Sequence, residues 1–286
     1  MSVKQQVFFH QPTSTATYLV WDEATKEAAV IDPALDFDAK SAKVSTVQAD
    51  EILDFAAGHG LKLVYSLETH AHADHLSAGD FLRRKTGAKV VIGEHITAIQ
   101  DRFRTMFGAD DVTPDGSQFD VLVTDGEVLM LGETPIEVMY TPGHTSADVS
   151  YRIGDAIYVG DTLFMPDYGT ARTDFPGGDA QALYRSIRRI LELPPETKIY
   201  VGHDYLPEGR TSFAWETTVA EQRARNVHIH DGVTEEAFVE HRKARDATLA
   251  PPVLILPSLQ VNIRAGAMPP PEKDGRIYLR LPVTFT

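Results

Sequence analysis

A run of seven residues at positions 69–75, Thr-His-Ala-His-Ala-Asp-His, constrains the fold of this chain more than any other feature. It places three imidazoles and a carboxylate directly after the apolar stretch at residues 61–67, which is typical of a buried strand. Residues two apart on an extended segment point to the same side, so His70 and His72 can face one metal ion. The apolar spacing that follows predicts a helix over residues 75–86. We therefore expect metal ligands in a turn between a strand and a helix.

The composition limits which metal sites are available. The 286 residues include no cysteine, which excludes disulfides, thiolate zinc ligands, iron–sulfur clusters and a cysteine nucleophile. Any metal must be held by His, Asp or Glu. The formal charge of −14 argues against nucleic acid and anionic membranes as partners, and an anionic small substrate would need a local basic pocket. Because we find neither a membrane-spanning apolar stretch nor a signal-peptide pattern, we expect a cytoplasmic protein.

Short apolar segments separated by turn residues predict two groups of strands. A helix is expected at residues 49–58, and the acidic, less regular residues 100–127 are expected to be loop. Two strand-rich halves with helices between them favour an α/β (α+β) fold in which two packed sheets are covered by helices. The expected strands are residues 7–10, 16–21, 27–32, 61–67, 88–93, 128–131, 136–141, 149–153 and 156–160.

Three later polar residues, His144, Asp161 and His203, each follow an expected strand and a glycine. Glycine leaves space for the close backbone approach that a crowded metal loop needs. The candidate ligands are His70, His72, Asp74, His75, His144, Asp161 and His203. The other histidines are interpreted as hydrogen-bonded structural residues, namely His10, His59, His95, His228, His230 and His241.

The motif at residues 70–75, followed in order by His144, Asp161 and His203, resembles the metallo-β-lactamase fold superfamily over residues 5–225. The resemblance implies a four-layer αββα sandwich with the metal at one edge of the two sheets. The motif identifies the fold but not the reaction, because hydrolases, nucleases, flavoproteins and dioxygenases share it.

Segments outside the ligands resemble the persulfide dioxygenases of bacterial type, which are related to glyoxalase II. These segments are Asp167–Phe175, Leu183–Ile187, Gly202–Tyr205 and Pro257–Gly266. The resemblance implies one Fe(II) per chain, held by His70, His144 and Asp161, with open positions for a substrate sulfur and dioxygen. It implies oxidation of glutathione persulfide, or a related low-molecular-weight persulfide, by O2 to sulfite and free thiol, in sulfide detoxification.

The four remaining candidate ligands leave a second function open. In an iron dioxygenase we expect His72, Asp74, His75 and His203 to orient ligands and solvent around the metal. In a Zn(II) hydrolase of thioesters, like glyoxalase II, or of lactams or lactones, they complete a dinuclear centre, and Asp74 accepts a proton. The identity of the ligands does not separate these alternatives. The preference for the oxygenase therefore rests on the resemblance of the sequences at residues 171–175 and 202–205 to the persulfide dioxygenases.

The resemblance also implies substrate contacts. Arg172 and Tyr205 are the expected substrate-binding residues, and Arg172 could pair with a carboxylate of glutathione. The alternatives are an internal salt bridge of Arg172 with Asp174 or Asp167, and core packing of Tyr205. The expected catalytic residues are Tyr205, His203 and Asp74.

We expect a catalytic domain at residues 1–230, and a C-terminal helix and extended tail at residues 231–286 that pack on the same domain. A helix is expected at residues 213–226, and another at 234–246 whose basic run is interpreted as a solvated face. The proline-rich tail can pack on the domain or on another subunit, so a homodimer is one arrangement that it allows.

Overall fold

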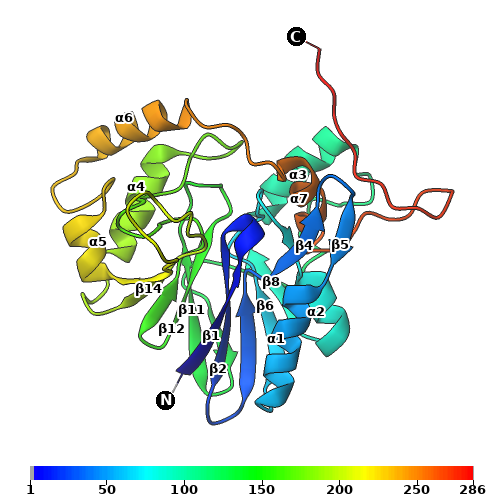
Figure 1. Ribbon diagram of the computed structural model, residues 1–286, viewed down its shortest axis with the longest axis horizontal. Coiled ribbons are helices and arrows are strands. Elements are labelled where there is room, and N and C mark those ends of the chain that lie inside the picture. The colour runs from blue at the N-terminus through cyan, green and yellow to red at the C-terminus, as the bar shows by residue number, and fades with distance from the viewer. Residues whose placement is uncertain (1–2, 286) are drawn as a thin grey trace.

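The structure, a computed structural model, describes residues 3–285, and the strands among these residues form two six-stranded sheets and one small sheet (Figure 1). The first sheet has the order β1 (Val3–His10), β2 (Thr15–Asp22), β3 (Glu27–Ile31), β6 (Lys62–Leu67), β8 (Lys89–Gly93) and β9 (Val121–Val123). The second sheet has the order β10 (Val128–Leu131), β11 (Thr134–Tyr140), β12 (Val149–Ile153), β13 (Ala156–Tyr158), β14 (Lys198–Tyr200) and β15 (Glu216–Thr218). The small sheet contains β5 (Lys43–Ser45), β4 (Ala34–Asp38) and β7 (Leu76–Ser77).

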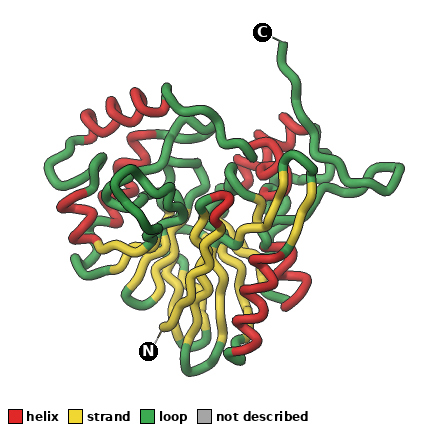
Figure 2. Tube along the Cα trace, viewed as in Figure 1, coloured by secondary structure: helices red, strands yellow, loops and turns green. Residues whose placement is uncertain are grey.

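Helices cover the outer faces of both large sheets, as the red segments flanking the yellow strands show in Figure 2. The first sheet is covered by α1 (Val47–Gly58), α2 (Gly79–Thr86), α3 (Ile96–Phe107) and α7 (Ile255–Asn262). The second sheet is covered by α4 (Ala180–Ile190), α5 (Val219–Arg225) and α6 (Glu235–Asp246). The αββα sandwich expected from the sequence is therefore confirmed.

Buried tyrosines join the two sheets across the central core. The ring of Tyr18 in β2 lies 5.1 Å from that of Tyr158 in β13 and 5.4 Å from that of Tyr200 in β14. These edge-to-face contacts add about 0.5–1.5 kcal/mol each to the stabilisation from apolar burial. The Tyr18 hydroxyl also donates a hydrogen bond of 2.5 Å to the carbonyl of Val201. The first sheet thus positions the segment directly after β14, which carries the candidate ligand His203.

The directions of the strands bring the candidate ligands to one edge of the sandwich. β3, β6, β8 and β9 run parallel, as do β13 and β14. The carboxyl ends of parallel strands meet at the same edge, which is where open α/β sheets bind ligands. At this edge Ala16 of β2 donates a backbone hydrogen bond of 2.8 Å to Gly202, which joins the first sheet to the loop after β14.

Two helices begin later in the chain than the sequence predicts. The helix expected at residues 75–86 begins at Gly79, because Leu76 and Ser77 pair with β4 as a short strand. The helix expected at 213–226 is shorter, since residues 216–218 first complete the second sheet as β15. The side chain of Thr218 then accepts from the backbone of Glu221 and caps α5.

The expectation of loop over residues 100–127 is wrong for its first part. The helix α3 extends to Phe107, because Ile99, Phe103 and Phe107 fall on one buried face with helical spacing. β9 occupies residues 121–123, so the expected loop is confined to residues 108–120 and 124–127.

The C-terminal elements pack on the sandwich. α6 contacts α4 through Phe238 and Tyr184, whose ring centroids lie 5.6 Å apart. α7 packs beside α3, and the chain beyond it leaves the body as an extended tail (Figure 1). The proposed division at residue 230 stays a prediction.

Among the described residues, no helix has the length and apolar character needed to cross a membrane.

Candidate metal centre

The loop after β6 carries four candidate ligands, and Asp32 at the end of β3 holds it in place. The carboxylate of Asp32 accepts from the backbone N–H and the hydroxyl of Thr69, both at 2.8 Å. It also lies 3.0 Å from Nε2 of His72, whose other ring nitrogen, Nδ1, has no partner. Asp32 therefore fixes both the start of the loop and the orientation of one imidazole.

A first cluster contains His70, His144 and Asp161, whose ligand atoms all lie within 4.8 Å of one another. Oδ2 of Asp161 is 3.9 Å from Nε2 of His70 and 3.7 Å from Nε2 of His144. Nδ1–H of His144 donates to the carbonyl of Arg172 at 2.8 Å, which leaves Nε2 free to bind a metal. All three residues are buried.

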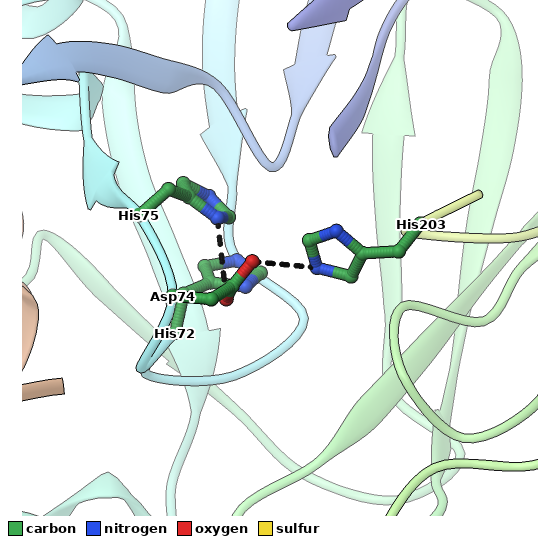
Figure 3. Close-up of side chains that lie close together, drawn as sticks. All are labelled: His72, Asp74, His75 and His203. Carbon is green, nitrogen blue, oxygen red and sulfur yellow. Dashed lines mark ion pairs between the residues drawn. The ribbon is translucent and has the colours of Figure 1, made fainter. Parts of the chain in front are cut away.

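A second cluster contains His72, Asp74, His75 and His203, shown in Figure 3. Nε2 of His203 lies 3.3 Å from Oδ2 of Asp74 and 3.3 Å from Oδ1 of Asp161. Nδ1 of His75 lies 3.5 Å from Oδ1 of Asp74. Asp161 therefore turns one oxygen to each cluster, so the two clusters form one continuous centre.

Glycines before Asp161 and His203 make this crowding feasible, as the sequence indicated. Gly160 has φ +50°, and a Cβ there would lie 2.3 Å from the Thr69 hydroxyl. A Cβ at Gly202 would lie 2.9 Å from Oδ1 of Asp161. Any larger residue at either position would push the ligands apart.

Buried polar atoms without partners show that these residues fit a metal. A buried polar group without a hydrogen bond costs about 1–3 kcal/mol, so convergence of several such atoms calls for a bound cation. Burial lowers the pKa of His70 well below its usual range and that of His75 to about 4, which keeps both imidazoles neutral, as ligation requires. The atoms are Nε2 of His70, Nδ1 of His72, Oδ2 of Asp74, Nε2 of His75, Oδ1 of Asp161 and Nε2 of His203.

Three residues that orient the loop were missed in the sequence. Besides Asp32, Oε2 of Glu68 lies 3.6 Å from Nε2 of His72. Asn262 of α7 donates to the backbone carbonyls of His72 and His75 at 2.7 and 2.8 Å. Asp32 and Glu68 directly follow apolar strands, which is the signal that identified Asp161, but nothing local distinguishes Asn262.

A cavity of about 250 Å³ opens onto the centre. Its lining includes Asp74, His144 and Asp161 together with aromatic and basic side chains. The aromatic residues are Phe164, Tyr168, Phe175 and Tyr205, and the basic residues are Arg172, Arg242 and Arg245. The centre is thus accessible to a small molecule with apolar and anionic parts.

Both residues expected to bind substrate lie in this lining. Arg172 donates to the two carboxylate oxygens of Asp174 at 2.6 and 2.7 Å, and to the carbonyl of Ala250 at 2.7 Å, so the internal salt bridge with Asp174 is present. Tyr205 is 41% exposed, which argues against core packing, and its ring stacks on His203 with centroids 5.5 Å apart.

The interpretation of the basic run in α6 as a solvated face is wrong for two of its residues. Arg242 is 1% exposed and pairs with Asp246 at 2.7 Å, while Arg245 is half-buried in the cavity lining. The helix packs this face inward because it covers the second sheet beside α4.

The six histidines assigned structural roles lie outside both clusters. His10 contacts Thr13 at 2.7 Å and Asp36 at 3.2 Å, and His59 contacts the carbonyl of Phe55 at 2.8 Å. Nδ1 of His228 accepts from the backbone N–H of Thr170 at 3.0 Å. The remaining three are His95, His230 and His241.

Known proteins resemble this chain over most of its length. A probable metallo-hydrolase of Burkholderia pseudomallei is 50% identical over 287 residues, which cover 96% of this chain and 97% of the relative. The mitochondrial persulfide dioxygenase ETHE1 of Bos taurus is 32% identical over 269 residues, with 92% and 89% covered. The crystal structure of ETHE1 from Myxococcus xanthus matches with a TM-score of 0.74 and 33% identity, covering 92% of this chain and 100% of that one.

The sequence profile of the Metallo-beta-lactamase superfamily matches residues 10–203, the segment that contains every candidate ligand. The same residues form most of the two sheets, from β2 to β14, and the centre at their shared edge. The chain belongs to the metallo-β-lactamase superfamily.

Proposed function

We propose that this chain is an Fe(II)-dependent persulfide dioxygenase that oxidises glutathione persulfide, or a related low-molecular-weight persulfide, to sulfite and free thiol. The observation that carries the proposal is the cluster of His70, His144 and Asp161, of which the last two face the cavity. Two histidines and one carboxylate are the ligand set of non-haem ferrous oxygenases. The likeness to the two ETHE1 proteins supports the same reaction.

A ferrous ion in this set would supply adjacent open positions for a sulfur anion and dioxygen. Persulfide, dioxygen and one water then give thiol, sulfite and two protons. The outer sulfur receives all three oxygens and loses the electrons that reduce dioxygen. The S–S bond breaks, and the inner sulfur leaves as the thiol.

The residues of the chain position these reactants. The carbonyl of Arg172 fixes the ring of His144, and Phe164 and Phe175 exclude water from the cavity wall. The hydroxyl of Tyr205 can donate to the substrate sulfur or to oxygen. His203 and Asp74, 3.3 Å apart, can hold the water that becomes the third oxygen of sulfite.

The test is oxygen uptake by anaerobically purified protein supplied with glutathione persulfide, with metal analysis of the same sample. We expect uptake, sulfite as product and about one iron per chain. His144→Ala should lose both metal and uptake, whereas His59→Ala, which changes an exposed histidine that caps the C-terminal end of α1, should keep both. No uptake by iron-loaded protein would refute the proposal.

A zinc-dependent thioester hydrolase is the second candidate, and the second cluster favours it. His72, Asp74, His75 and His203 provide a full ligand set for another metal. The probable metallo-hydrolase that is 50% identical to this chain supports hydrolysis. In that reaction Asp74 would accept a proton from the attacking water. Two zinc ions per chain and thioester cleavage without oxygen would establish this candidate.

A further inference from the structure

A loop over residues 204–214 follows the last candidate ligand, and one buried carboxylate closes it. The carboxylate of Asp204 accepts from the backbone N–H of Leu206 at 3.3 Å and from that of Ala214 at 2.7 Å. Both Nη atoms of Arg210 bind the same carboxylate, Nη1 at 2.8 Å. Asp204 and Arg210 thus join the two ends of the loop from inside.

This loop carries Tyr205, whose place in the cavity wall depends on a strained backbone. The next residue, Leu206, has φ +47°, in the left-handed region that is unfavourable for residues other than glycine. Such a conformation persists only when surrounding contacts hold it. The ring centroid of Tyr205 lies 5.9 Å from that of Phe164 and 5.1 Å from that of Tyr168, and all three rings line the cavity. The contacts that hold the loop therefore also decide where the Tyr205 hydroxyl lies.

Arg210 joins this loop to a second segment of the cavity wall. Its Nε lies 2.7 Å from Oδ2 of Asp167, in the turn at residues 164–169. That turn is fixed independently by α5, because the side chain of Gln222 donates to the carbonyl of Phe164 at 2.7 Å. One guanidinium thus ties the loop both to its own buried carboxylate and to a turn that is held from elsewhere.

We propose that Arg210 is a positioning residue, which sets the place of the Tyr205 hydroxyl by tying its loop to Asp167. This inference rests on the proposed function, in which that hydroxyl donates to the substrate sulfur or to oxygen. Arg210 lies outside the cavity lining, so it acts on the reaction only through Tyr205. A displacement of about 1 Å in such a group can cost up to about 100-fold in rate, so loosening the loop should slow the reaction while the metal ligands stay in place.

The variant that tests this role must spare the buried part of the network. Arg210→Gln would leave the carboxylate of Asp204 buried without its cation, which is expected to destabilise the whole fold. Asp167→Ala breaks only the tie between the two segments, and its side chain is 45% exposed. The matched control is Asp231→Ala, which removes an exposed carboxylate that pairs with Arg223 at 3.0 Å, outside the cavity lining.

The kinetic test is a double-mutant cycle in the iron-loaded enzyme with glutathione persulfide. Asp167→Ala should lower kcat/KM about 10-fold, and Asp231→Ala should leave it unchanged. In a Tyr205→Phe background, Asp167→Ala should have no further effect, because the hydroxyl that it displaces is already absent. An equal loss in both backgrounds, no loss in Asp167→Ala, or full activity of Tyr205→Phe would overturn the proposal.

Hydrogen exchange separates this inference from the proposed function, because it does not depend on turnover. In the iron-loaded protein kept anaerobic, the backbone amides of residues 204–214 should exchange about 10-fold faster in Asp167→Ala than in wild type and Asp231→Ala. If no persulfide supports oxygen uptake but this pattern holds, the proposed reaction is wrong and the tie made by Arg210 stands. Unchanged exchange in this loop would refute the role of Arg210, whatever the activity.

Discussion

Asn262 donates a hydrogen bond of 2.7 Å to the backbone carbonyl of His72, although 190 residues separate them in the sequence. Its second amide hydrogen binds the carbonyl of His75 at 2.8 Å, and its oxygen accepts from the backbone N–H of Ser77 at 2.8 Å. One side chain of α7 thus holds both ends of the segment that carries three candidate ligands. Because these groups are buried, no water can substitute for Asn262.

Replacing Asn262 by leucine should impair both stability and metal binding. Loss of three buried hydrogen bonds should lower the free energy of unfolding by about 3 kcal/mol. Gln260→Leu is a matched control, because Gln260 is buried in the same helix and bonds to Leu256 and Arg280, away from the loop. Denaturant unfolding and metal titration should show both variants destabilised, but only Asn262→Leu with reduced metal affinity. An affinity equal to that of Gln260→Leu would mean that the loop holds its own shape.

The two clusters should respond differently to loss of one histidine. His144→Ala removes a ligand of the proposed iron site and should leave little bound metal. His75→Ala should retain about one iron per chain when iron is saturating, with about 10- to 100-fold weaker affinity. The reason is that we expect His75 to orient the ligands and solvent rather than to bind the iron itself. Metal analysis after anaerobic reconstitution measures the metal content of both variants. A fall from two metals to one in His75→Ala would instead indicate a dinuclear centre.

Arg172→Ala should raise KM more than it lowers kcat. The change removes a cation from the cavity and also releases Ala250, whose carbonyl the guanidinium binds. Asp174→Asn tests how the arginine acts, since it breaks the ion pair and keeps the guanidinium. We expect it to raise KM several-fold as well, because a loosened Arg172 no longer holds the wall. An unchanged or lower KM in Asp174→Asn would show that Arg172 contacts substrate directly.

His228 should make the protein less stable in mild acid. Burial, together with the charges of Arg242 and His241, lowers the pKa of His228 to about 3. The unfolded chain binds a proton near pH 6.5 and the folded one does not, so this stability is present above pH 6.5 and is lost as pH falls towards 3. His228→Asn keeps an acceptor for Thr170 and cannot titrate. Between pH 7 and 5 the variant should lose about 1 kcal/mol less stability than wild type, after allowance for partial exposure.

The control for this prediction is His59→Asn, on the exposed end of α1. Thermal unfolding at several pH values measures the slope of stability for each protein. The His59 variant should follow the wild-type slope. A wild-type slope in His228→Asn would mean that this histidine is protonated in the folded state.

The cluster of candidate ligands was predictable because each of these residues is defined locally. His70 and His72 follow an apolar strand, and Asp161 and His203 each follow a strand and a glycine. Parallel strands then bring these positions to one edge whatever the details of packing. The same reasoning predicted the two packed sheets, since alternating apolar and polar residues and continuous apolar runs indicate which strands are buried.

The residues that act on the ligands could not be predicted in this way. Asp32 meets His72 only because β3 and β6 are neighbours, and Asn262 meets it only because α7 packs against β7. Helical spacing puts Arg242 and Arg245 on similar sides of α6, but it does not say that this side faces a cavity. Such roles depend on tertiary contacts between distant segments, and periodicity carries no information on these.

The bond between Asn262 and His72 also sets the order of events during synthesis. At 5–20 residues per second, Asn262 leaves the peptidyl transferase centre about 10 to 40 s after His72. For that interval the histidine loop exists without the side chain that holds it. We therefore expect metal binding by this loop to be a late step, which follows the docking of α7 and does not guide the first collapse of the sheets.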